Sequence, residues 1–337
     1  MHFLITGHTG FKGAWLSLIL RQRGHLVSGI SLEPEVGSLF EQAEIGRFLE
    51  NDIRCDIRDL TKLRSHVSSI DPDVIIHLAA QALVRESYLH PIDTFETNVM
   101  GTLNVLKASQ QVSDLKAQLI VTTDKVYKNT SKATGYIETE ALGGQDPYSA
   151  SKAMADMATQ SWLSSFNSPP TAIARAGNVI GGGDVCADRL IPDLINSYTS
   201  GLTPKLRAPM SVRPWQHVLD CLNGYLILVD AIIQKKQDGA WNFGPDENQC
   251  KTVADVATIA GLTWGVQKSW QNDEGKHPRE ASMLALNSNK ARAELGWRNK
   301  LGFSESVEWT INWYKNVHHG AGPLEAMLKN IEDFESK

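Results

Sequence analysis

Short apolar runs alternate with stretches of helical periodicity through the first half of the chain. The apolar runs predict buried strands at His2–Thr6, Leu26–Ser31, Val74–Leu78, Leu119–Thr122 and Thr171–Arg175. The stretches between them predict helices at Lys12–Arg23, Leu60–Ser69, Pro91–Gln111 and Pro147–Ser165. Repeated strand–helix–strand units form a parallel sheet that is covered on both faces. We therefore expect an α/β fold, a doubly wound parallel sheet of the Rossmann type.

The pattern loosens after residue 176 into loops rich in glycine and proline. Helical spacing returns at Trp215–Gln234 and at Ser304–Val317. We expect a Rossmann domain over residues 1–176, to which the helix near 215–234 returns, and a smaller C-terminal lobe over residues 177–337. A cleft between two such parts is a common place for a ligand.

Composition narrows the class of protein. The chain has 337 residues, of which 42% are hydrophobic and 21% charged, as in ordinary globular proteins. The formal net charge is -5 and no basic run stands out, which argues against nucleic acid as a partner. The cysteines are far apart, which predicts neither a metal site nor a disulfide framework; they are Cys55, Cys186, Cys221 and Cys250.

Nothing in the chain predicts a targeting or membrane segment. "MHFLITG" has no basic leader and reads as a strand, and the most apolar later stretch, "YLILVDAII", is short and contains Asp230. We expect a cytoplasmic protein.

A glycine-rich turn joins the first strand to the first helix. "ITGHTGFKGAWL" places Gly7, Gly10 and Gly13 around Phe11. Small residues at a strand–turn–helix junction let the backbone approach a pyrophosphate, which the helix N-terminus attracts. The turn predicts a dinucleotide site. The second strand ends in Ser31 instead of a carboxylate, so the sequence leaves the choice between NAD and NADP open.

Later strand ends could complete the dinucleotide site. Asp56, with Ile57 beside it, could accept a hydrogen bond from the adenine amino group, although Asp59 could equally be a helix cap and Asp56 merely solvated. Ala79 and Ala80 are small and leave room for the ligand. The neighbouring His77 is more typical of a packed core histidine than of a catalyst.

Tyr148 and Lys152 form the strongest local signal, in "LGGQDPYSASK". Four residues apart on a helix, they lie on one face. A tyrosine that acts as a base at neutral pH needs roughly 4 kcal/mol of stabilisation for its phenolate, because its free pKa is about 10. A neighbouring ammonium supplies part of this.

Taken together, these motifs resemble the extended short-chain dehydrogenase/reductases, and within that family the CDP-glucose 4,6-dehydratases. The resemblance rests on segments that occur in family order: "TGHTGFKGAWLSL", "HLAAQALVRESY", "TNVMGT", "TTDKVY", "LGGQDPYSASK", "ARAGNVIGGGD", "DRLIPD", "RPWQHV", "WNFGP" and "ELGW". It implies NAD as cofactor, a nucleotide-diphosphate hexose as substrate and a homodimer. It further implies oxidation at carbon 4, loss of water across carbons 5 and 6, and hydride return to carbon 6. Such enzymes make deoxysugars for surface polysaccharides such as lipopolysaccharide.

The resemblance also assigns roles to residues. Tyr148 would take the proton of the carbon 4 hydroxyl, Lys152 would tune Tyr148 and hold the nicotinamide ribose, and Thr123 would hydrogen-bond the same hydroxyl. Asp124 and Lys125 stand where these dehydratases keep their acid and base, and which of them is the base stays open. The alternative for this pair is a simple salt bridge at the end of the strand.

Substrate contacts are expected in the second half. Asn178, Arg189 and Arg213 are candidates for the sugar and the diphosphate, since a guanidinium suits a diphosphate. The loop "KNTSKATGYIE" lacks the acidic, tryptophan-rich stretch expected from the resemblance, so another nucleotide or sugar is an alternative substrate. Two alternative functions are a nucleotide-sugar 4-epimerase and a non-catalytic NAD-binding regulator.

Overall fold

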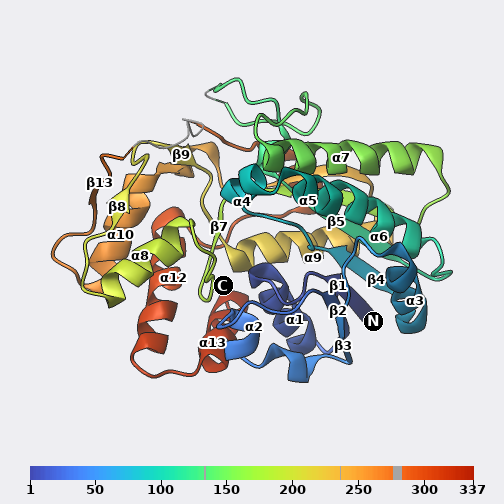
Figure 1. Cartoon of the computed structure of the whole chain (residues 1–337), viewed down its shortest axis with the longest axis horizontal. Helices are drawn as coiled ribbons and strands as arrows, with labels where there is room; N and C mark the ends of the chain where they lie inside the picture. Colours follow the sequence, from blue (N-terminus) through green and yellow to red (C-terminus); the bar gives the residue numbers. More distant parts are fainter. Residues whose placement is uncertain (133, 236, 276–282) are drawn as a thin grey trace.

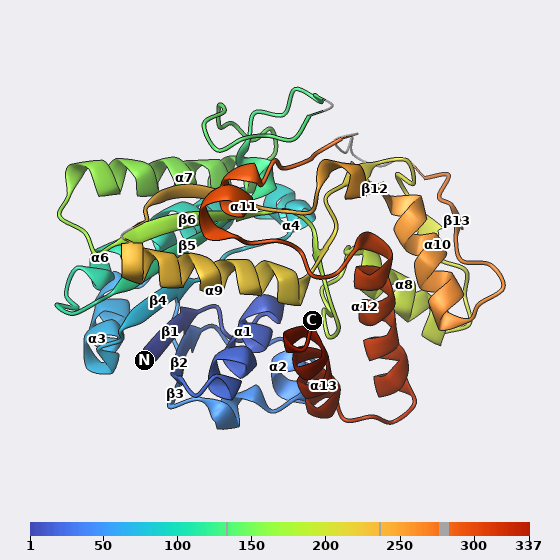
Figure 2. The same ribbon diagram turned by 180° about the vertical axis from the view of Figure 1, so that it is seen from behind.

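The computed structural model describes residues 1–132, 134–235, 237–275 and 283–337. Its centre is a seven-stranded sheet in the order β11-β6-β5-β4-β1-β2-β3, in which every pairing is parallel. The strands are β1 (His2–Thr6), β2 (Leu26–Ser31), β3 (Asn51–Arg54), β4 (Val74–His77), β5 (Ala117–Thr123), β6 (Thr171–Ala176) and β11 (Gly239–Phe243). Helices cover both faces, and a smaller lobe stands at one end (Figures 1 and 2). The expected doubly wound fold is confirmed.

Alternating side chains along each strand build two cores. Phe3 and Ile5 of β1 pack toward α1 (Phe11–Gln22) and α9 (Val218–Lys235), whereas Leu4 packs toward α3 (Leu60–Ile70) and α6 (Gly101–Ser109). Successive residues of a strand point to opposite faces, which explains this division. Both faces are buried, so the strands show as continuous apolar runs in the sequence.

The same face as α3 and α6 also carries α4 (Val84–Leu89), α5 (Pro91–Phe95) and α7 (Pro147–Ser165). Between α5 and α6 the chain makes a π-helical turn at Glu96–Met100, where the sequence predicted one continuous helix over Pro91–Gln111. The turn presents the buried Asn98, whose amide donates to Gln81 O at 2.9 Å and to Ser151 Oγ of α7 at 2.8 Å. Helical apolar spacing does not reveal such a shift in register.

The lobe is built mainly from three helices around its own core. They are α8 (Leu190–Thr199), α10 (Val253–Trp264) and α12 (Phe303–His318). Short strand pairs connect the lobe: β7 (Val179–Ile180) with β10 (Gln216–His217), β9 (Val212–Arg213) with β12 (Lys251–Thr252), and β8 (Lys205–Leu206) with β13 (Gln271–Asn272). The remaining elements are α2 (Leu39–Gln42), α11 (Asn289–Leu295), α13 (Pro323–Glu335) and 3₁₀ turns at Ile45–Phe48, Asp124–Val126 and Glu247–Gln249.

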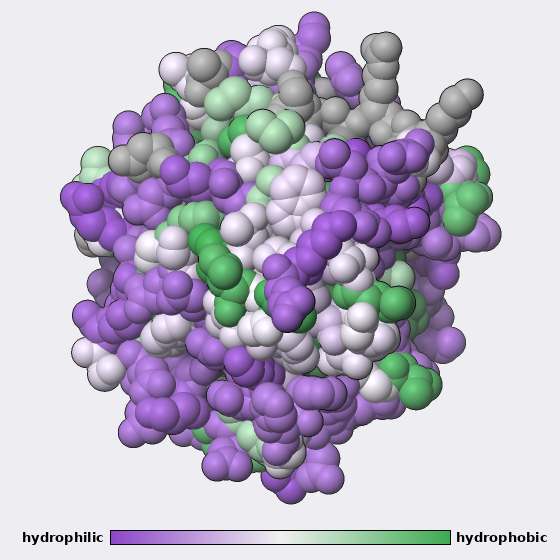
Figure 3. All heavy atoms as spheres, turned by 90° about the vertical axis from the view of Figure 1, so that its left-hand side faces the viewer, coloured by the Kyte–Doolittle hydropathy of each residue, from purple (hydrophilic) through white to green (hydrophobic). Residues whose placement is uncertain are grey.

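Residues beyond 176 contribute to both parts of the molecule. The expected returning helix is α9, which packs on the sheet, and β11 adds a strand beside β6 that the sequence analysis did not expect. Strand β3 was also not expected, because "NDIR" is short and polar. At the end occupied by the lobe, Figure 3 shows a mainly hydrophilic face with small separate groups of hydrophobic residues. No described helix combines the length and the apolar character needed to cross a membrane.

Candidate active site

The carboxyl end of β5 carries the first group of candidate residues. The strand runs buried to Thr123, and a 3₁₀ turn over Asp124–Val126 follows. Thr123 caps this turn: its Oγ1 accepts from Lys125 N at 3.4 Å and donates to Asp124 Oδ1 at 2.9 Å. The turn therefore fixes an acidic and a basic side chain at the sheet edge where α/β folds bind ligands.

Asp124 lies in an unusual environment for a carboxyl group. It is 2% exposed, and its Oδ2 has no hydrogen-bond partner among the described residues. Burial raises the pKa of Asp124, while Lys125, Thr123, Arg213 and Lys12 oppose that shift. A raised pKa favours the protonated form of a carboxyl group, which is the form that can donate a proton.

Helix α7 brings the second group to the same place. Asp146 caps the helix by accepting from Ser149 N at 2.9 Å, and Pro147 opens its first turn. Tyr148 and Lys152 are 9% and 5% exposed. Lys152 Nζ donates to Val121 O of β5 at 2.9 Å, which ties the helix to the strand.

Electrostatics distinguish the residues of this centre. Burial, together with a smaller effect of the Lys12 charge, lowers the pKa of Lys152 to about 8. Burial raises the pKa of Tyr148 to about 12; a hydrogen bond with Thr123 and the charge of Arg189 oppose the shift. Lys125 Nζ lies 5.7 Å from the centroid of the Tyr148 ring. The five predicted catalytic residues therefore meet in one place, although their individual roles stay predictions.

The glycine-rich turn has the geometry that a dinucleotide needs. Gly7 has φ +80°, and a Cβ there would lie 2.6 Å from Ala79 N; a Cβ on Gly13 would lie 2.3 Å from Gly7 O. Side chains are thus excluded where β1, α1 and the end of β4 meet. Helix α1 starts after Gly10 with no side-chain cap and no acidic residue in its first turn. Its free N–H groups suit a phosphate, so the residues present fit NAD.

The residues expected around the adenosine follow the ends of β3 and β4. Asp59 is the N-cap of α3, accepting from Lys62 N at 3.0 Å. Asp56 accepts from Arg58 N at 2.8 Å and pairs with the Arg58 guanidinium at 2.7 Å. Ile57 is buried and Ala80 is half-buried. The cofactor role of Asp56, Ile57, Ala79 and Ala80 stays a prediction.

His77 is a structural residue, as expected. It is 1% exposed, and its two ring nitrogens hydrogen-bond Thr6 Oγ1 at 2.6 Å and Thr102 Oγ1 at 3.0 Å. Burial lowers the pKa of His77 to about 3, with a smaller effect of Lys152. The histidine is therefore neutral at physiological pH.

The candidate substrate residues border the centre from the lobe side. A Cβ on Gly177, next to Asn178, would lie 3.2 Å from Asp124 Oδ2 and 2.5 Å from Pro214 Cγ. Arg213 is 8% exposed and its charge lowers the pKa of Asp124. Arg189 Nη1 donates to Asp184 Oδ2 at 2.9 Å, and its charge lowers the pKa of Tyr148. Their contacts with substrate stay predictions.

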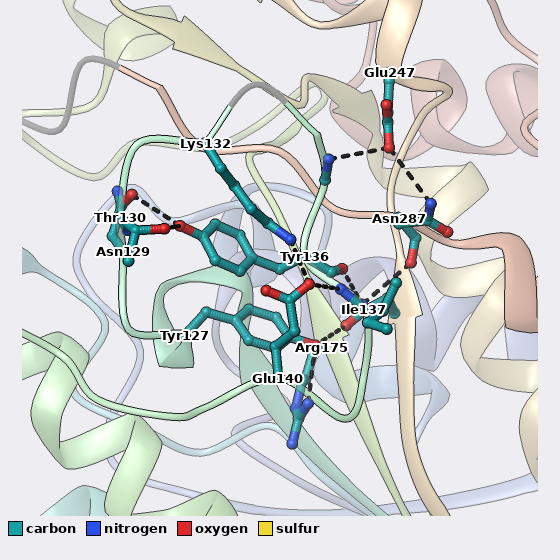
Figure 4. A network of polar contacts seen from close by, with 12 residues as sticks. Tyr127, Asn129, Thr130, Lys132, Tyr136, Ile137, Glu140, Arg175, Glu247 and Asn287 are labelled. Atoms are coloured by element: carbon teal, nitrogen blue, oxygen red, sulfur yellow. Dashed lines mark hydrogen bonds and ion pairs between the residues drawn. The ribbon is translucent and has the colours of Figure 1, made fainter.

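A polar network that the sequence analysis missed holds residues 128–132 and 134–142, which follow the β5 turn (Figure 4). The rings of Tyr127 and Tyr136 stack at 5.1 Å, and Lys132 lies 4.5 Å from the Tyr136 centroid. Arg175 Nη1 donates to Tyr127 OH at 2.9 Å and to Glu138 O at 2.9 Å. These contacts fix Tyr127, the residue after the Asp124–Val126 turn, and with it the start of the loop.

Arg175 itself pairs with Asp156 of α7 in a fully buried ion pair. Its Nε and Nη2 donate to the two oxygens of Asp156, both at 2.8 Å, and Thr122 Oγ1 of β5 donates to the same carboxylate at 3.1 Å. Bidentate pairs of this kind fix geometry as well as charge. This contact sets α7 against β5 and β6, behind the catalytic centre. Among the described residues, no three His, Cys, Asp or Glu side chains are arranged to hold a metal ion.

Comparison with known proteins agrees with this geometry. The family model described as GDP-mannose 4,6 dehydratase matches residues 4–310. The chain belongs to this 4,6-dehydratase family. It is 41% identical to the CDP-glucose 4,6-dehydratase of Salmonella typhimurium over 98% of this chain and 95% of that protein. It is 26% identical to the dTDP-glucose 4,6-dehydratase of Shigella flexneri over 95% of this chain and 96% of that protein.

Solved structures of the same fold include a 4,6-dehydratase and a 4-epimerase. A dTDP-glucose 4,6-dehydratase from Bacillus anthracis in complex with NAD has a TM-score of 0.81 at 24% identity, covering 96% of this chain and 99% of that chain. A UDP-glucose 4-epimerase from Thermus thermophilus in complex with NAD has a TM-score of 0.80 at 24% identity, covering 95% of this chain and all of that chain. At these identities the likeness concerns the fold.

Proposed function

We infer that this protein is an NAD-dependent nucleotide-sugar 4,6-dehydratase that acts on CDP-glucose. One observation carries the inference beyond the family: the buried Asp124 and the adjacent Lys125 lie beside Tyr148 and Lys152 at the end of β5. A 4-epimerase needs Tyr148 and Lys152 but no additional acid and base. Intact Tyr148 and Lys152 also speak against a non-catalytic regulator.

Oxidation at carbon 4 rests on α7. Tyr148 removes the proton of the carbon 4 hydroxyl, which Thr123 hydrogen-bonds, and Lys152 holds the nicotinamide ribose. When bound, NAD would supply the acceptor for the carbon 4 hydride and the source of the hydride returned to carbon 6. The Gly7–Gly13 turn would hold its pyrophosphate, and Ala79 and Ala80 leave space beside it. The raised pKa of Tyr148 means that nearby cations must stabilise its phenolate, and Arg189 is one of them.

Elimination rests on the turn after β5. The new ketone acidifies the proton on carbon 5, which a base removes, and the carbon 6–oxygen bond breaks as a proton reaches the departing hydroxyl. Asp124 suits the role of proton donor because burial raises its pKa. Lys125 is the basic side chain of the same turn, and we propose it as the candidate for the carbon 5 base.

CDP-glucose is proposed as the substrate on the similarity to the Salmonella enzyme. Arg213 and Arg189 offer guanidinium groups for the diphosphate, and Asn178 lies beside Gly177 at the same edge. The test is a screen of purified protein against nucleotide hexoses with products identified by mass spectrometry. A product lighter by one water, without net NADH, is expected from CDP-glucose. An unchanged mass with altered stereochemistry would identify an epimerase instead.

We further propose a homodimer that works in the cytoplasm and supplies a deoxysugar for lipopolysaccharide. Exposed apolar side chains support the dimer, because they gather on the neighbouring helices α4, α5 and α7 and on the π-helical turn. They are Tyr88, Leu89, Ile92, Met100, Met154 and Met157. A second copy of the chain would cover this face, which Figure 1 shows on the side of the sheet that carries α7.

A further inference from the structure

Lys12 is a charged residue inside the glycine-rich turn that the dinucleotide motif does not require. It is the second residue of α1 and is half-buried. Its Nζ donates to the hydroxyl of Tyr225 at 3.2 Å and lies 5.5 Å from the centroid of that ring. Tyr225 is fully buried on α9, so it holds the ammonium on the inner side of α1. Two N–H groups of the ammonium stay available for another acceptor.

The charge of Lys12 acts on the catalytic centre. It lowers the pKa of Lys152 and that of Asp124, so the ammonium lies within electrostatic reach of both. Lys12 thus adds a third lysine side chain to those of Lys125 and Lys152. The carboxyl group of the β5 turn, Asp124, has a pKa that burial raises, which favours its neutral form.

The positive charge of these lysines is only partly balanced, because the charge of Asp156 raises the pKa of Lys152. Within the described residues, none of the three lysines forms an ion pair with a carboxylate. Lys12 is also set apart from the two others, because it belongs to the helix that starts at the glycine turn. A cation that is partly withdrawn from water and has no carboxylate partner favours the binding of an anion.

The start of α1 supplies donors for the same anion. The helix has 12 residues, and its first turn contains neither a side-chain cap nor an acidic residue. A Cβ on Gly10 would meet only Gly7 O, at 3.4 Å, so the approach to the helix start is open. The helix start and the ammonium of its second residue thus face the region between the glycine turn and the catalytic centre.

We propose that Lys12 binds the dinucleotide phosphate that lies nearest the catalytic centre, and that Tyr225 positions its ammonium for this contact. The inference rests on the proposed function, since it presumes a dinucleotide on the glycine turn. It adds a side-chain contact to the backbone contacts of the motif. A reaction that returns its hydride leaves NAD unchanged, so a tighter phosphate contact keeps the cofactor in place from one turnover to the next.

The test measures binding by calorimetry on cofactor-free protein with three ligands: NAD, ADP-ribose and AMP. AMP carries the adenine half and lacks the phosphate nearest the catalytic centre. Lys12→Met should weaken binding of NAD and of ADP-ribose by about tenfold or more, as expected for the loss of a charge-assisted hydrogen bond, and leave AMP binding unchanged. Lys12→Arg should bind NAD within about threefold of the parent, because it keeps the charge.

Two further measurements sharpen the result. Added salt should weaken NAD binding to the parent more than to Lys12→Met, since only the parent has the ammonium–phosphate pair. Tyr225→Phe keeps the ammonium but removes its hydrogen bond, so it should weaken NAD binding by a smaller factor than Lys12→Met. Should Lys12→Met unfold, Lys12→Gln is the second neutral variant for the same titrations.

The other possible outcomes contradict either the role of Lys12 or the proposed function. Equal NAD affinity in Lys12→Met and the parent overturns the inference, and so does an equal loss of AMP and NAD binding, which would indicate a structural role. A parent protein that binds no NAD would instead contradict the proposed function. The comparison of Lys12→Met with Lys12→Arg therefore tests Lys12 separately from the presence of the cofactor site.

Discussion

Proton transfer in this centre depends on the environment of single side chains. Asp124 has one oxygen held by Thr123 at 2.9 Å and the other without a partner among the described residues. An unpartnered buried carboxyl oxygen is costly for stability unless function uses it. Gly177 keeps the space beside this oxygen small but free of a side chain. The geometry therefore suits donation of a proton to the departing hydroxyl.

Asp124→Asn should separate elimination from oxidation. The amide keeps the shape of the carboxyl group but has no transferable acidic proton, whereas Tyr148 and Lys152 stay in place. Water loss should slow by about 10² to 10⁴-fold, the usual contribution of general acid catalysis. Rapid mixing with CDP-glucose should then show NADH absorbance that persists, and mass analysis of the quenched sugar should show a 4-ketone that still has its carbon 6 hydroxyl.

Asp71→Asn is the control, because Asp71 is an exposed carboxylate at the end of α3 with left-handed φ 45°, which asparagine also tolerates. It should behave as the parent. Loss of oxidation and elimination together in Asp124→Asn, or dehydration at the parent rate, would make Asp124 a structural residue of the β5 turn.

Lys152 should destabilise the folded protein at neutral pH, because burial lowers its pKa to about 8 from the ordinary 10.5. Between these two values the unfolded chain binds more protons, so the free energy of unfolding rises with pH across this window. Well below pH 8 the penalty is complete, about 3 kcal/mol. The free energy of unfolding of Lys152→Met should therefore exceed that of the parent most at pH 7, and the difference should become progressively smaller toward pH 10.

Urea unfolding at several pH values measures the free energy of unfolding of Lys152→Met and of the parent. Only the change of their difference with pH is informative. The substitution also removes the hydrogen bond to Val121 O, but that loss is the same at every pH. Lys205→Met, at an exposed position of β8, should show no such change. A difference between Lys152→Met and the parent that stays constant from pH 7 to pH 10 would mean that Lys152 has an ordinary pKa.

At the scale of elements, β1 and α1 must approach each other closely for the cofactor turn to form. A Cβ on Gly13 would lie 2.3 Å from Gly7 O and 2.6 Å from His8 Cα. These are backbone atoms, so they can move apart only if the turn opens. The position of the α1 start relative to β4 thus depends on the absence of one methyl group.

Gly13→Ala should displace the turn and weaken NAD binding by at least about 100-fold, since the phosphate contacts depend on this geometry. The free energy of unfolding should fall by about 1–3 kcal/mol from overpacking. Gly302→Ala is the matched control, because a Cβ there would meet only Gln249 Oε1, at 4.0 Å. Calorimetry with NAD and thermal unfolding measure the two effects. Unaltered NAD affinity in Gly13→Ala would contradict the assignment of the turn.

Local patterns in the sequence predicted much of this architecture. The bounds of β1, β2 and α7 were predicted residue for residue, because continuous apolar runs and a proline-started helix are local signals. Strand β11 was missed, since "GAWNF" is a strand only through pairing with β6, which is more than sixty residues earlier. The π-helical turn was missed because the change affects backbone register without changing the spacing of apolar residues.

The same distinction applies to the candidate site. Motif residues such as Gly7, Tyr148 and Lys152 were recognisable because their spacing is local. Arg175 and Asp156 were not recognised, since their buried pair forms only when α7 packs on β6. Lys12 was overlooked inside a motif that is defined by its glycines, and its partner Tyr225 is 213 residues away. Contacts between distant segments have no signature in a single sequence.

At the scale of the whole molecule, one face of the sheet has exposed apolar residues that the fold itself does not cover. Ile92 of α5 is 68% exposed and Met154 of α7 is 48% exposed, on helices that pack side by side. Charging both, as Ile92→Glu with Met154→Glu, should convert the proposed dimer into folded monomers. A twofold interface brings the same surface of both chains together, so the introduced carboxylates would face each other and repel.

Sedimentation equilibrium measures the mass of each variant. The control is Leu262→Glu, at a position that is 70% exposed on α10 of the lobe, and it should stay dimeric. A monomeric parent, or equal dissociation of the α10 variant, would contradict this interface.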